Sequence, residues 1–440
     1  MIILGIETSC DETALALIDA KGNSIRILGN IIHSQADLHA KYGGVFPNLA
    51  KREHQKNLIP LLDALLKESG LKRANLAKQT PPNSKHSKPP KIYSQILDLP
   101  AQARNLRIDL EREPELLEQF GKFIPTIEKP PIDAIAVTFG PGLEPALWVG
   151  INFAKALGAM WNIPVVPTNH MEGHIFSALL RREERHKTQY TKTKQETKQQ
   201  KSKLKATRYT LHAIRFPAIA LLISGGHTEL VLVKKLSEYK IIGETKDDAV
   251  GEAFDKVARL LVLKYPGGPE ISALAEQARK SFLTLSTPEL KNLQTNVQLP
   301  RPMLHSGDYH FSFSGLKTAV LYTVKKIPKL TAAIKQALAR EFEDSVTEVL
   351  ISKTTRAVKE FEAKTLIIAG GVIANKHIRS AFEELRETAF PSLELLIPEI
   401  PHSTDNALMI ALAGFLNLKA GVKPDKSDTL KIVAEGRARL

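Results

Sequence analysis

The chain has 440 residues, of which 43% are hydrophobic and 25% are charged, a balance typical of soluble globular proteins. This length can bury more than one core and predicts two lobes or domains. A single cysteine, Cys10, excludes an internal disulfide and fits a reducing compartment. No apolar run approaches the roughly 20 residues that cross a bilayer, and the first residues lack the basic start of a signal peptide. We therefore expect a cytoplasmic protein that does not bind membranes.

The net charge of +14 is concentrated in two segments. Residues 72–91 hold six Lys and Arg and no acid, residues 181–208 hold eleven Lys and Arg and three acids, and the remainder holds 44 basic and 44 acidic residues. The first segment contains four prolines and the second almost no large aliphatic side chains. We predict that both are solvated insertions, because such compositions cannot bury a core. The alternative for the second segment is an electrostatic arm that binds a polyanion.

The chain opens with an apolar strand at residues 2–6, and a second apolar strand follows at residues 14–18. The polar turn between them contains Asp11 and Glu12. Backbone N–H groups and hydroxyls of such a turn can hold a phosphate, with the two acids beside the ligand or its metal. An ordinary hairpin explains the same pattern, and without other features we prefer it.

Two glycine-rich turns follow in the first half. Residues 42–54 form a loop with Gly and Pro that leads into a helix with a leucine-rich apolar face. Residues 132–137 predict a buried strand, and the turn at residues 140–142 separates it from another helix. A strand, a glycine-rich turn and a helix in this order can form an anion-binding corner.

Two histidines four residues apart follow the strand predicted at residues 163–166. If a helix starts here, His170 and His174 lie one turn apart on one face, and their imidazoles can converge on one cation. Glu172 then points away, which argues against the His-Glu-x-x-His arrangement of zinc proteases. Histidines at a helix end without any ligand are the more frequent case, so the pair alone does not decide between the two interpretations.

The opening pattern recurs about 215 residues later. A strand at residues 218–223, a polar turn at 224–229 and a returning strand at 230–233 repeat the first arrangement. The turn contains Gly225 and Gly226, which allow a close approach of the backbone to a ligand. The repetition predicts a duplicated fold whose two lobes face each other across a cleft.

The remaining candidates lie towards the C-terminus. A glycine pair at residues 370–371 lies between a predicted strand and a helix that starts near Lys376, a position that suits the sugar or base of a nucleotide. Asp405 precedes a helix predicted at residues 407–418. It either caps that helix or supplies the carboxylate that completes a metal site with the two histidines.

Ten motifs occur in the order of one known family. They are the runs 5–13, 42–54, 140–143, 170–174, 224–228, 248–255, 266–269, 313–317, 370–375 and 404–406. Each is weak alone, but the ordered set is highly specific. On these motifs the chain resembles the TsaD family, the tRNA adenosine threonylcarbamoyltransferases formerly named O-sialoglycoprotein endopeptidases. The resemblance covers nearly everything outside residues 70–130 and 181–214.

The resemblance implies an α/β protein with the duplicated fold shared by actin, heat-shock chaperone ATPases and sugar kinases (the ASKHA fold), with two lobes around a central cleft. We expect lobe I at residues 1–180, with the basic Pro-rich insertion at about 71–92. A basic insertion at 181–214 and lobe II at 215–400 follow. Residues 401–440 form a metal-ligand segment and a helix that returns to lobe I.

The resemblance also implies an activity and the residues that carry it. The family transfers the threonylcarbamoyl group from threonylcarbamoyl-AMP to N6 of the adenosine next to the anticodon, in tRNAs reading codons that begin with A, and releases AMP. One divalent metal, iron(II) or zinc, would bind His170, His174 and Asp405. The residues near the reacting group would be His227, Asp11 and Glu12. The residues that bind the adenylate would be Leu222, Ile223, Ser224, Gly225, Gly226, Asp255, Gly268 and Asn375.

Partners and rival functions complete the expectation. The resemblance implies tRNA and threonylcarbamoyl-AMP as substrates, a TsaB-like paralogous partner and a TsaE-like ATPase. The rivals are a metalloprotease, an ATPase or phosphotransferase of the same fold class, and a non-catalytic scaffold. The histidine spacing argues against the first rival, and retention of both histidines and Asp405 argues against the last. Glu144 and Pro145 depart from the family pattern, so the turn after Gly142 is expected to differ.

Overall fold

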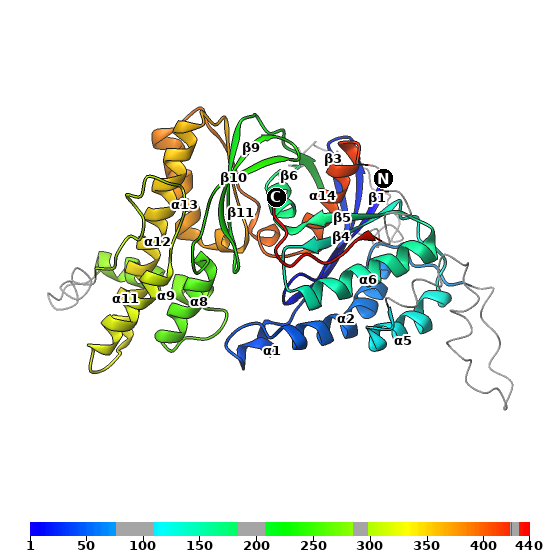
Figure 1. Ribbon diagram of the computed structural model, residues 1–440, viewed down its shortest axis with the longest axis horizontal. Helices are drawn as coiled ribbons and strands as arrows, with labels where there is room; N and C mark the ends of the chain where they lie inside the picture. Colours follow the sequence, from blue (N-terminus) through cyan, green and yellow to red (C-terminus); the bar gives the residue numbers. More distant parts are fainter. Residues whose placement is uncertain (76–109, 184–206, 285–297, 423, 425–430) are drawn as a thin grey trace, which may run out of the picture.

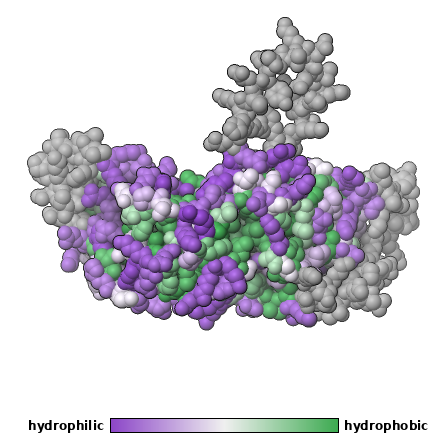
Figure 2. All heavy atoms as spheres, turned by 90° about the horizontal axis from the view of Figure 1, so that it is seen from above, coloured by the Kyte–Doolittle hydropathy of each residue, from purple (hydrophilic) through white to green (hydrophobic). Residues whose placement is uncertain are grey.

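The computed structural model describes residues 1–75, 110–183, 207–284, 298–422, 424 and 431–440. Most of the Pro-rich insertion predicted at about 71–92, and the central part of the basic insertion at 181–214, therefore lie outside the described residues. Within the described part of the chain, no helix combines the length and the apolarity that a bilayer crossing requires. On the face seen in Figure 2, hydrophilic and hydrophobic side chains of the described residues are interspersed.

The first sheet has seven strands among the described residues, in the order β5-β4-β1-β2-β3-β7-β6 (Figure 1). They are β1 (Ile2–Glu7), β2 (Glu12–Lys21), β3 (Ser24–Ser34), β4 (Ala134–Gly140), β5 (Val165–Asn169), β6 (Leu180–Arg182) and β7 (Arg208–Leu211). Strands β1, β2 and β3 pair antiparallel, whereas β4 is parallel to β1 and β5 is parallel to β4. In β1 and β4 nearly every side chain is buried, because helices cover both faces of the sheet.

The second sheet repeats this plan with five strands of the described chain, in the order β10-β9-β8-β11-β12. They are β8 (Ala218–Ile223), β9 (Thr228–Lys235), β10 (Glu238–Glu244), β11 (Thr365–Ala369) and β12 (Glu394–Leu396). Strands β8, β9 and β10 pair antiparallel, β11 is parallel to β8, and β12 is parallel to β11. The strand order of β3-β2-β1-β4-β5 therefore recurs as β10-β9-β8-β11-β12, which confirms the predicted duplication. We call the first sheet with its outer helices lobe I and the second with its outer helices lobe II.

Helices form three layers around the two sheets (Figure 1). The outer face of the first sheet packs against α2 (Pro47–Glu68), α5 (Pro114–Phe123) and α6 (Glu144–Trp161), with the short α1 (Ala36–Ala40) beside them. The outer face of the second sheet packs against α8 (Val250–Leu260), α9 (Gly267–Thr284), α11 (Ser314–Lys325), α12 (Ala332–Glu360) and α13 (Lys376–Ala389). The inner faces of both sheets contribute to one core that contains α7 (His170–Ser177) and α14 (Ala407–Lys419).

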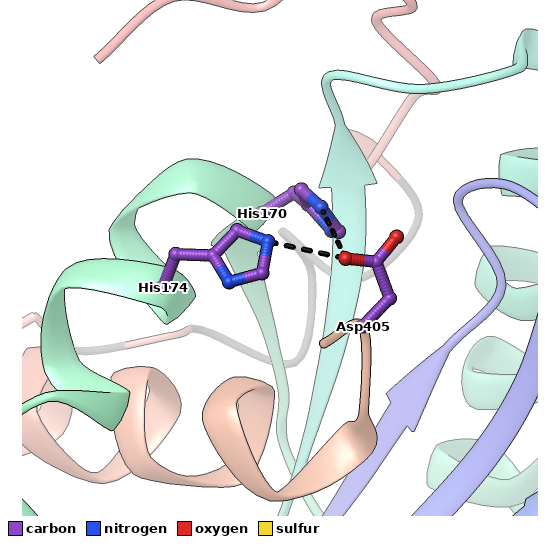
Figure 3. A group of neighbouring side chains, drawn as sticks. All are labelled: His170, His174 and Asp405. Carbon is purple, nitrogen blue, oxygen red and sulfur yellow. Dashed lines mark hydrogen bonds and ion pairs between the residues drawn. The ribbon is translucent and has the colours of Figure 1, made fainter. Parts of the chain in front are cut away.

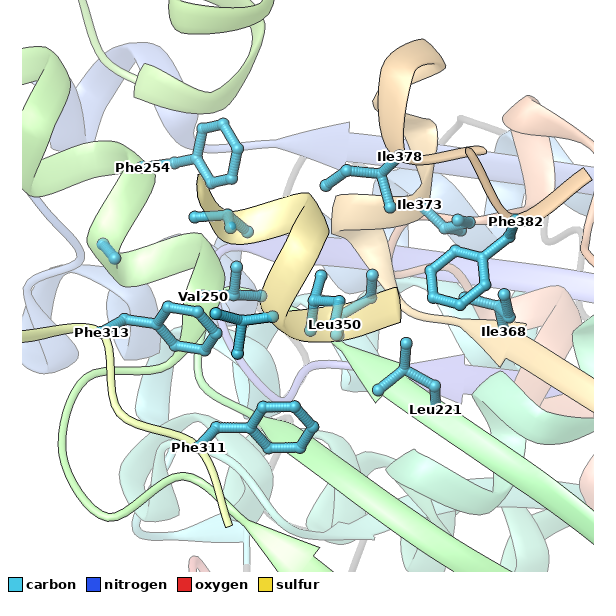
Figure 4. Packing of buried hydrophobic residues seen from close by; sticks show 14 of the residues in the cluster. Leu221, Val250, Phe254, Phe311, Phe313, Leu350, Ile368, Ile373, Ile378 and Phe382 are labelled. Atoms are coloured by element: carbon cyan, nitrogen blue, oxygen red, sulfur yellow. The ribbon is translucent and has the colours of Figure 1, made fainter. Parts of the chain in front are cut away.

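The core of lobe II illustrates how these layers are held (Figure 4). Phe254 of α8 and Phe342 of α12 meet edge to face, with ring centroids 4.9 Å apart. Leu221 of β8 and Ile368 of β11 are fully buried beneath the same helices. Burial of each such side chain contributes about 1.5–3 kcal/mol, so the helices that carry the polar site residues are fixed by apolar packing.

Helix α14 lies directly on the first sheet, although it follows the whole of lobe II in the chain. A Cβ on Gly5 of β1 would stand 2.2 Å from the carbonyl oxygen of Ala407, and a Cβ on Gly414 would stand 2.4 Å from Cβ of Ala136 in β4. Both glycines thus allow helix and sheet to touch without side chains between them. The last residues return to the same lobe, because Glu435 N–H donates to the carbonyl of Phe139.

The predicted basic insertion at 181–214 begins and ends within the first sheet. Strand β7 pairs antiparallel with β3 on one side and with β6 on the other. These strands are three and four residues long, which is too short for an alternating pattern to distinguish them from a polar loop.

Candidate functional site

Helix α7 begins where β5 ends, and the side chain of Asn169 caps it. Oδ1 of Asn169 accepts hydrogen bonds from the N–H groups of Met171, at 2.8 Å, and Glu172, at 3.3 Å. The helix that the histidine spacing required therefore starts at His170. All eight of its residues are buried, so the histidines are not surface residues at a helix end.

The structure brings His170, His174 and Asp405 together (Figure 3). Nε2 of His174 lies 3.1 Å from Oδ1 of Asp405, and Nε2 of His170 lies 3.5 Å from the same oxygen. The three potential ligand atoms lie within 4.8 Å of one another. Two imidazole nitrogens and one carboxylate oxygen converging on one point form a donor set that fits a divalent transition metal and leaves other coordination positions free.

Asp405 does not cap α14, which was the other role open to it. Its neighbour Asn406 is the N-cap residue, and Oδ1 of Asn406 accepts the N–H of Met409 at 3.1 Å. The carboxylate of Asp405 is therefore free to face the two imidazoles. Adjacent residues at this helix start thus have separate tasks, one towards the helix and one towards the site.

A second carboxylate, which the sequence analysis did not single out, supports the site from behind. Nδ1 of His170 lies 3.1 Å from Oε2 of Glu7 and 3.2 Å from Oγ of Ser9. Glu7 is fully buried and also accepts hydrogen bonds from the hydroxyl of Thr138, at 2.6 Å, and the N–H of Ser9, at 2.5 Å. A carboxylate on the far nitrogen of a ligating histidine fixes its tautomer and ring orientation. In the sequence, the one feature that distinguishes Glu7 is that it is an acid at the end of an otherwise apolar strand.

The charges of the site favour a cation at its centre. Burial lowers the pKa of His170, but Asp405 and Glu7 outweigh it, and the pKa lies well above the ordinary value. Burial raises the pKa of Asp405, but the two histidines outweigh it and hold the pKa well below its usual range. The buried carboxylate of Glu7 and the partly buried carboxylate of Asp405 thus create a negative potential that either a proton or a metal ion can neutralise.

His227 of lobe II interacts electrostatically with the two histidines and Asp405 of the candidate metal site. It lies in the turn between β8 and β9, where its N–H donates to Oγ of Ser224 at 3.1 Å and its carbonyl accepts the N–H of Ser224 at 2.9 Å. Burial, together with the charges of His170 and His174, lowers the pKa of His227 to about 4. The imidazole is therefore neutral at pH 7.

The predicted adenylate stretch at residues 222–226 has a buried part and an open part. Leu222 and Ile223 are fully buried, whereas a Cβ on Gly225 or Gly226 would meet no described atom within 4 Å. Two further glycines pack closely against this stretch. A Cβ on Gly251 would stand 2.6 Å from the carbonyl oxygen of Ser224, and a Cβ on Gly370 would stand 2.4 Å from the carbonyl oxygen of Ile223. The turn is therefore packed on the side of Gly251 and Gly370 and open in the Cβ directions of Gly225 and Gly226.

Acids from both lobes lie near the other side of the site. Burial, Asp11 and Asp405 raise the pKa of Glu12 well above its ordinary value, and Oε1 of Glu12 accepts the hydroxyl of Ser34 at 3.3 Å. Burial, followed by the charges of Asp11 and Asp255, raises the pKa of Tyr265. Burial and, to a smaller extent, the charge of Asp11 in lobe I raise the pKa of Asp255 in lobe II, so the acids of the two lobes interact electrostatically.

Asp255, Gly268 and Asn375 mark the lobe II side of the predicted adenylate site. Oδ1 of Asp255 accepts the N–H of Gly267 at 2.7 Å, and the Cβ direction of Gly268 is open. The amide of Asn375 caps α13 by accepting the N–H of Ile378 at 3.0 Å, and it donates to Glu343 at 2.5 Å. The side chain of Asn375 is therefore held in place by the fold itself.

The fold and the site define a class: a duplicated α/β protein of the actin, chaperone ATPase and sugar kinase type, with a two-histidine, one-carboxylate group between its two sheets. The sequence model of the TsaD family, tRNA N6-adenosine threonylcarbamoyltransferase, matches residues 26–78, 120–189 and 201–412. The chain belongs to this family.

Relatives that bear this name agree over almost the whole length. The threonylcarbamoyltransferase of Thermosipho africanus (strain TCF52B) is 36% identical over 427 residues, 97% of either chain. That of Polynucleobacter asymbioticus (strain DSM 18221 / CIP 109841 / QLW-P1DMWA-1) is 38% identical over 433 residues, 96% of this chain and 93% of the relative. Among solved structures, full-length HypF in its phosphate- and nucleotide-bound form is similar with 11% identity and a TM-score of 0.46, over 96% of this chain and 47% of HypF.

Proposed function

We propose that this chain transfers the threonylcarbamoyl group of threonylcarbamoyl-AMP to N6 of the adenosine next to the anticodon, in tRNAs reading codons that begin with A. The observation that carries the proposal is the group of His170, His174 and Asp405, with both histidines buried, in a chain that the TsaD family model matches over most of its length. A proteolytic function has no support from the spacing, because Glu172 points away from the two histidines and accepts hydrogen bonds elsewhere.

The chemistry asks for orientation and charge stabilisation. Threonylcarbamoyl-AMP is a mixed carboxylic–phosphoric anhydride, so its acyl carbon is already activated. A divalent metal held by the triad, iron(II) or zinc, would polarise oxygens of the threonylcarbamoyl group when bound. The hydrogen bond between Glu7 and Nδ1 of His170 orients the imidazole so that Nε2 is directed into the site.

The remaining residues bind the adenylate and handle the proton. We assign the phosphate to the turn at Gly225 and Gly226, since the Cβ directions of both glycines are open and the backbone of such a turn suits an anion. Asp255, Gly268 and Asn375, together with the walls formed by Leu222, Ile223 and Ser224, would then surround the nucleoside. A bond forms between N6 and the acyl carbon, the bond from that carbon to the phosphate oxygen breaks, and AMP leaves.

One amine proton must leave N6 during this step. We assign its acceptance to His227, which is neutral at pH 7 and interacts electrostatically with the triad, or to Glu12, whose raised pKa makes its carboxylate a stronger base. Asp11, next to Glu12 in the sequence, would help to orient the reacting group.

The proposed partners follow from the family. We propose tRNA as the acceptor, a TsaB-like paralogue and a TsaE-like ATPase as associated proteins, and the cytoplasm as the compartment. The basic insertion at 181–208 starts from the sheet edge that follows α7, so we propose that it contacts the tRNA backbone. Deletion of residues 183–206 should then weaken tRNA binding and reduce its salt dependence; unchanged binding would identify the segment as a solvated linker.

The experiment is transfer of radiolabelled threonine from threonylcarbamoyl-AMP to an unmodified A-decoding tRNA in the presence of the candidate partners. Wild type is compared with His174→Ala and with His305→Ala, which removes an exposed histidine of lobe II. Label on tRNA with wild type and His305→Ala, but not with His174→Ala, supports the proposal. Label with all three would keep the transfer and remove the triad from it. No label with any protein, with partners known to be active, would reopen the ATPase and scaffold functions.

A further inference from the structure

The face of α7 opposite the two histidines carries a buried carboxylate. Glu172 is 6% exposed, although it stands between the two ligands in the sequence. Its Oε1 accepts the hydroxyl of Tyr239 at 2.9 Å, and its Oε2 accepts the side-chain N–H of Asn417 at 3.0 Å. A carboxylate buried without partners is strongly unfavourable, so both donors are needed to keep this side chain inside the protein.

The hydrogen bond between Asn417 and Glu172 joins α7 to α14, the helix that follows Asp405. His170 and His174 belong to α7, and Asp405 lies two residues before α14, which also carries Asn417. Elsewhere the two helices meet through apolar packing, since a Cβ on Gly173 would stand 3.1 Å from side-chain atoms of both Met409 and Ile410. Apolar contacts are non-directional and tolerate small shifts, whereas a hydrogen bond from Asn417 to Glu172 fixes one helix against the other.

The hydrogen bond between Tyr239 and Glu172 joins α7 to lobe II. Tyr239 belongs to β10, and its ring packs against the core between the sheets. Glu172 is thus the point at which α7, α14 and the second sheet meet through polar groups. A rotation or translation of α7 would break both contacts, and it would also carry His170 and His174 away from Asp405.

We propose that Glu172 is a positioning residue of the metal centre. Through Asn417 it sets the rotation and depth of α7 relative to the helix that follows Asp405, and through Tyr239 it couples this geometry to lobe II. The proposal rests on the metal site proposed above and adds to it a set of residues that touch neither metal nor substrate. Displacements below 1 Å are sufficient for such an effect, since ligand sets require that precision.

The test uses Co²⁺ as the metal and the purified full-length chain. Asn417→Asp places a second carboxylate against Glu172, so we expect Co²⁺ affinity to fall about tenfold and the visible d–d spectrum to change. The double variant Glu172→Gln with Asn417→Asp should restore both, because the glutamine amide can donate to Asp while its oxygen still accepts from Tyr239. Asn23→Asp is the matched control: it introduces the same charge at an exposed asparagine that contacts Lys419, near the same end of α14.

The outcomes separate this proposal from the metal site itself. Absence of Co²⁺ binding by the wild type would overturn the metal site. Binding by the wild type, with the same affinity and spectrum in a folded Asn417→Asp variant, would overturn the positioning role. If circular dichroism shows that Asn417→Asp is unfolded, Tyr239→Phe decides instead: a folded protein with about threefold weaker Co²⁺ binding supports the proposal, and an unchanged affinity and spectrum contradict it. In the transfer assay the supporting result is a lower kcat with unchanged KM for tRNA.

Discussion

The two halves of the molecule share one strand order but differ in the turn that follows their first strand. Strand β1 ends with the buried Glu7, and the turn after it contains the buried hydroxyls of Thr8 and Ser9, with Asp11 at its end. The turn after β8 contains Gly225 and Gly226, both exposed, and the neutral His227. Equivalent positions have therefore taken complementary tasks: the first turn supplies negative charge that supports a cation, and the second supplies open backbone suited to an anion.

The same comparison extends to the inner helices. In the first half, β5 is followed by α7 with His170 and His174; in the second half, β12 is followed, after a short 3-10 helix (Ile400–His402), by Asp405 and α14. The proposed metal ligands thus come from corresponding places in the two repeats. Four predictions test how far the division of tasks between the halves holds, and they run from the largest expected effect to the smallest.

Asp405→Ala should remove metal binding and lower threonylcarbamoyl transfer by at least about a hundredfold, because it deletes the only ligand that the second repeat supplies among the described residues. The neighbouring Asn406→Ala is the control. It removes the helix cap and should lower the free energy of unfolding by about 1 kcal/mol while leaving metal stoichiometry intact. Metal content by mass spectrometry and denaturant titration distinguish the two. Equal metal content in both variants would contradict the assignment of Asp405.

Gly225→Val should leave the fold stable and raise the KM for threonylcarbamoyl-AMP about tenfold or more, because its side chain enters open space that we assign to the ligand. Gly370→Ala, in contrast, should destabilise the fold. Gly370 has a φ of 98°, which disfavours any other residue, and a Cβ there would stand 2.4 Å from the carbonyl oxygen of Ile223. The free energy of unfolding should therefore fall by about 2 kcal/mol or more. A KM unchanged in Gly225→Val would show that the turn of lobe II does not contact the adenylate.

Glu7→Gln should weaken metal binding about tenfold without removing it, since it retains the shape of the side chain and loses the charge behind His170. Competition with a chelator measures this affinity. Ser34→Ala is a useful comparison, because its hydroxyl donates to another acid at the edge of the site, Glu12. If Glu7→Gln and Ser34→Ala bind metal equally well, the turn of lobe I does not provide the charge that the comparison assigns to it.

Glu229→Gln should change only the pH dependence of stability. Burial and Glu244 raise the pKa of Glu229 to about 7 from an ordinary value near 4.5. Because the folded state holds this proton more tightly than the unfolded state, the contribution to stability is full below about pH 4.5 and is lost as pH rises through about 7. The variant should lack this loss and exceed the wild type by about 1–2 kcal/mol at pH 8. Thermal unfolding of both proteins from pH 5 to pH 8 measures this. An equal change of stability with pH in the variant and the wild type would contradict the prediction.

Whether a feature of the fold or of the candidate site could be predicted depends on how far apart in the sequence the contacting residues are. The duplicated fold follows from two similar strand–turn–strand patterns, and the helix at His170 follows from a local spacing. The dual possibility for Asp405 could not be resolved from sequence, since the decisive fact is that the next residue supplies the cap. Glu7 contacts His170 across 163 residues, and Glu172 contacts Asn417 across 245, and no local pattern encodes such pairs.

The position of α14 has a consequence for the synthesis of the protein. Helix α14 covers β1 at Gly5, but the ribosome synthesises this helix after the whole of lobe II. A growing chain on the ribosome therefore holds the two histidines long before it holds Asp405, and the first sheet keeps an uncovered inner face until the helix emerges. The three residues of the proposed metal site are therefore present together only when translation is nearly complete.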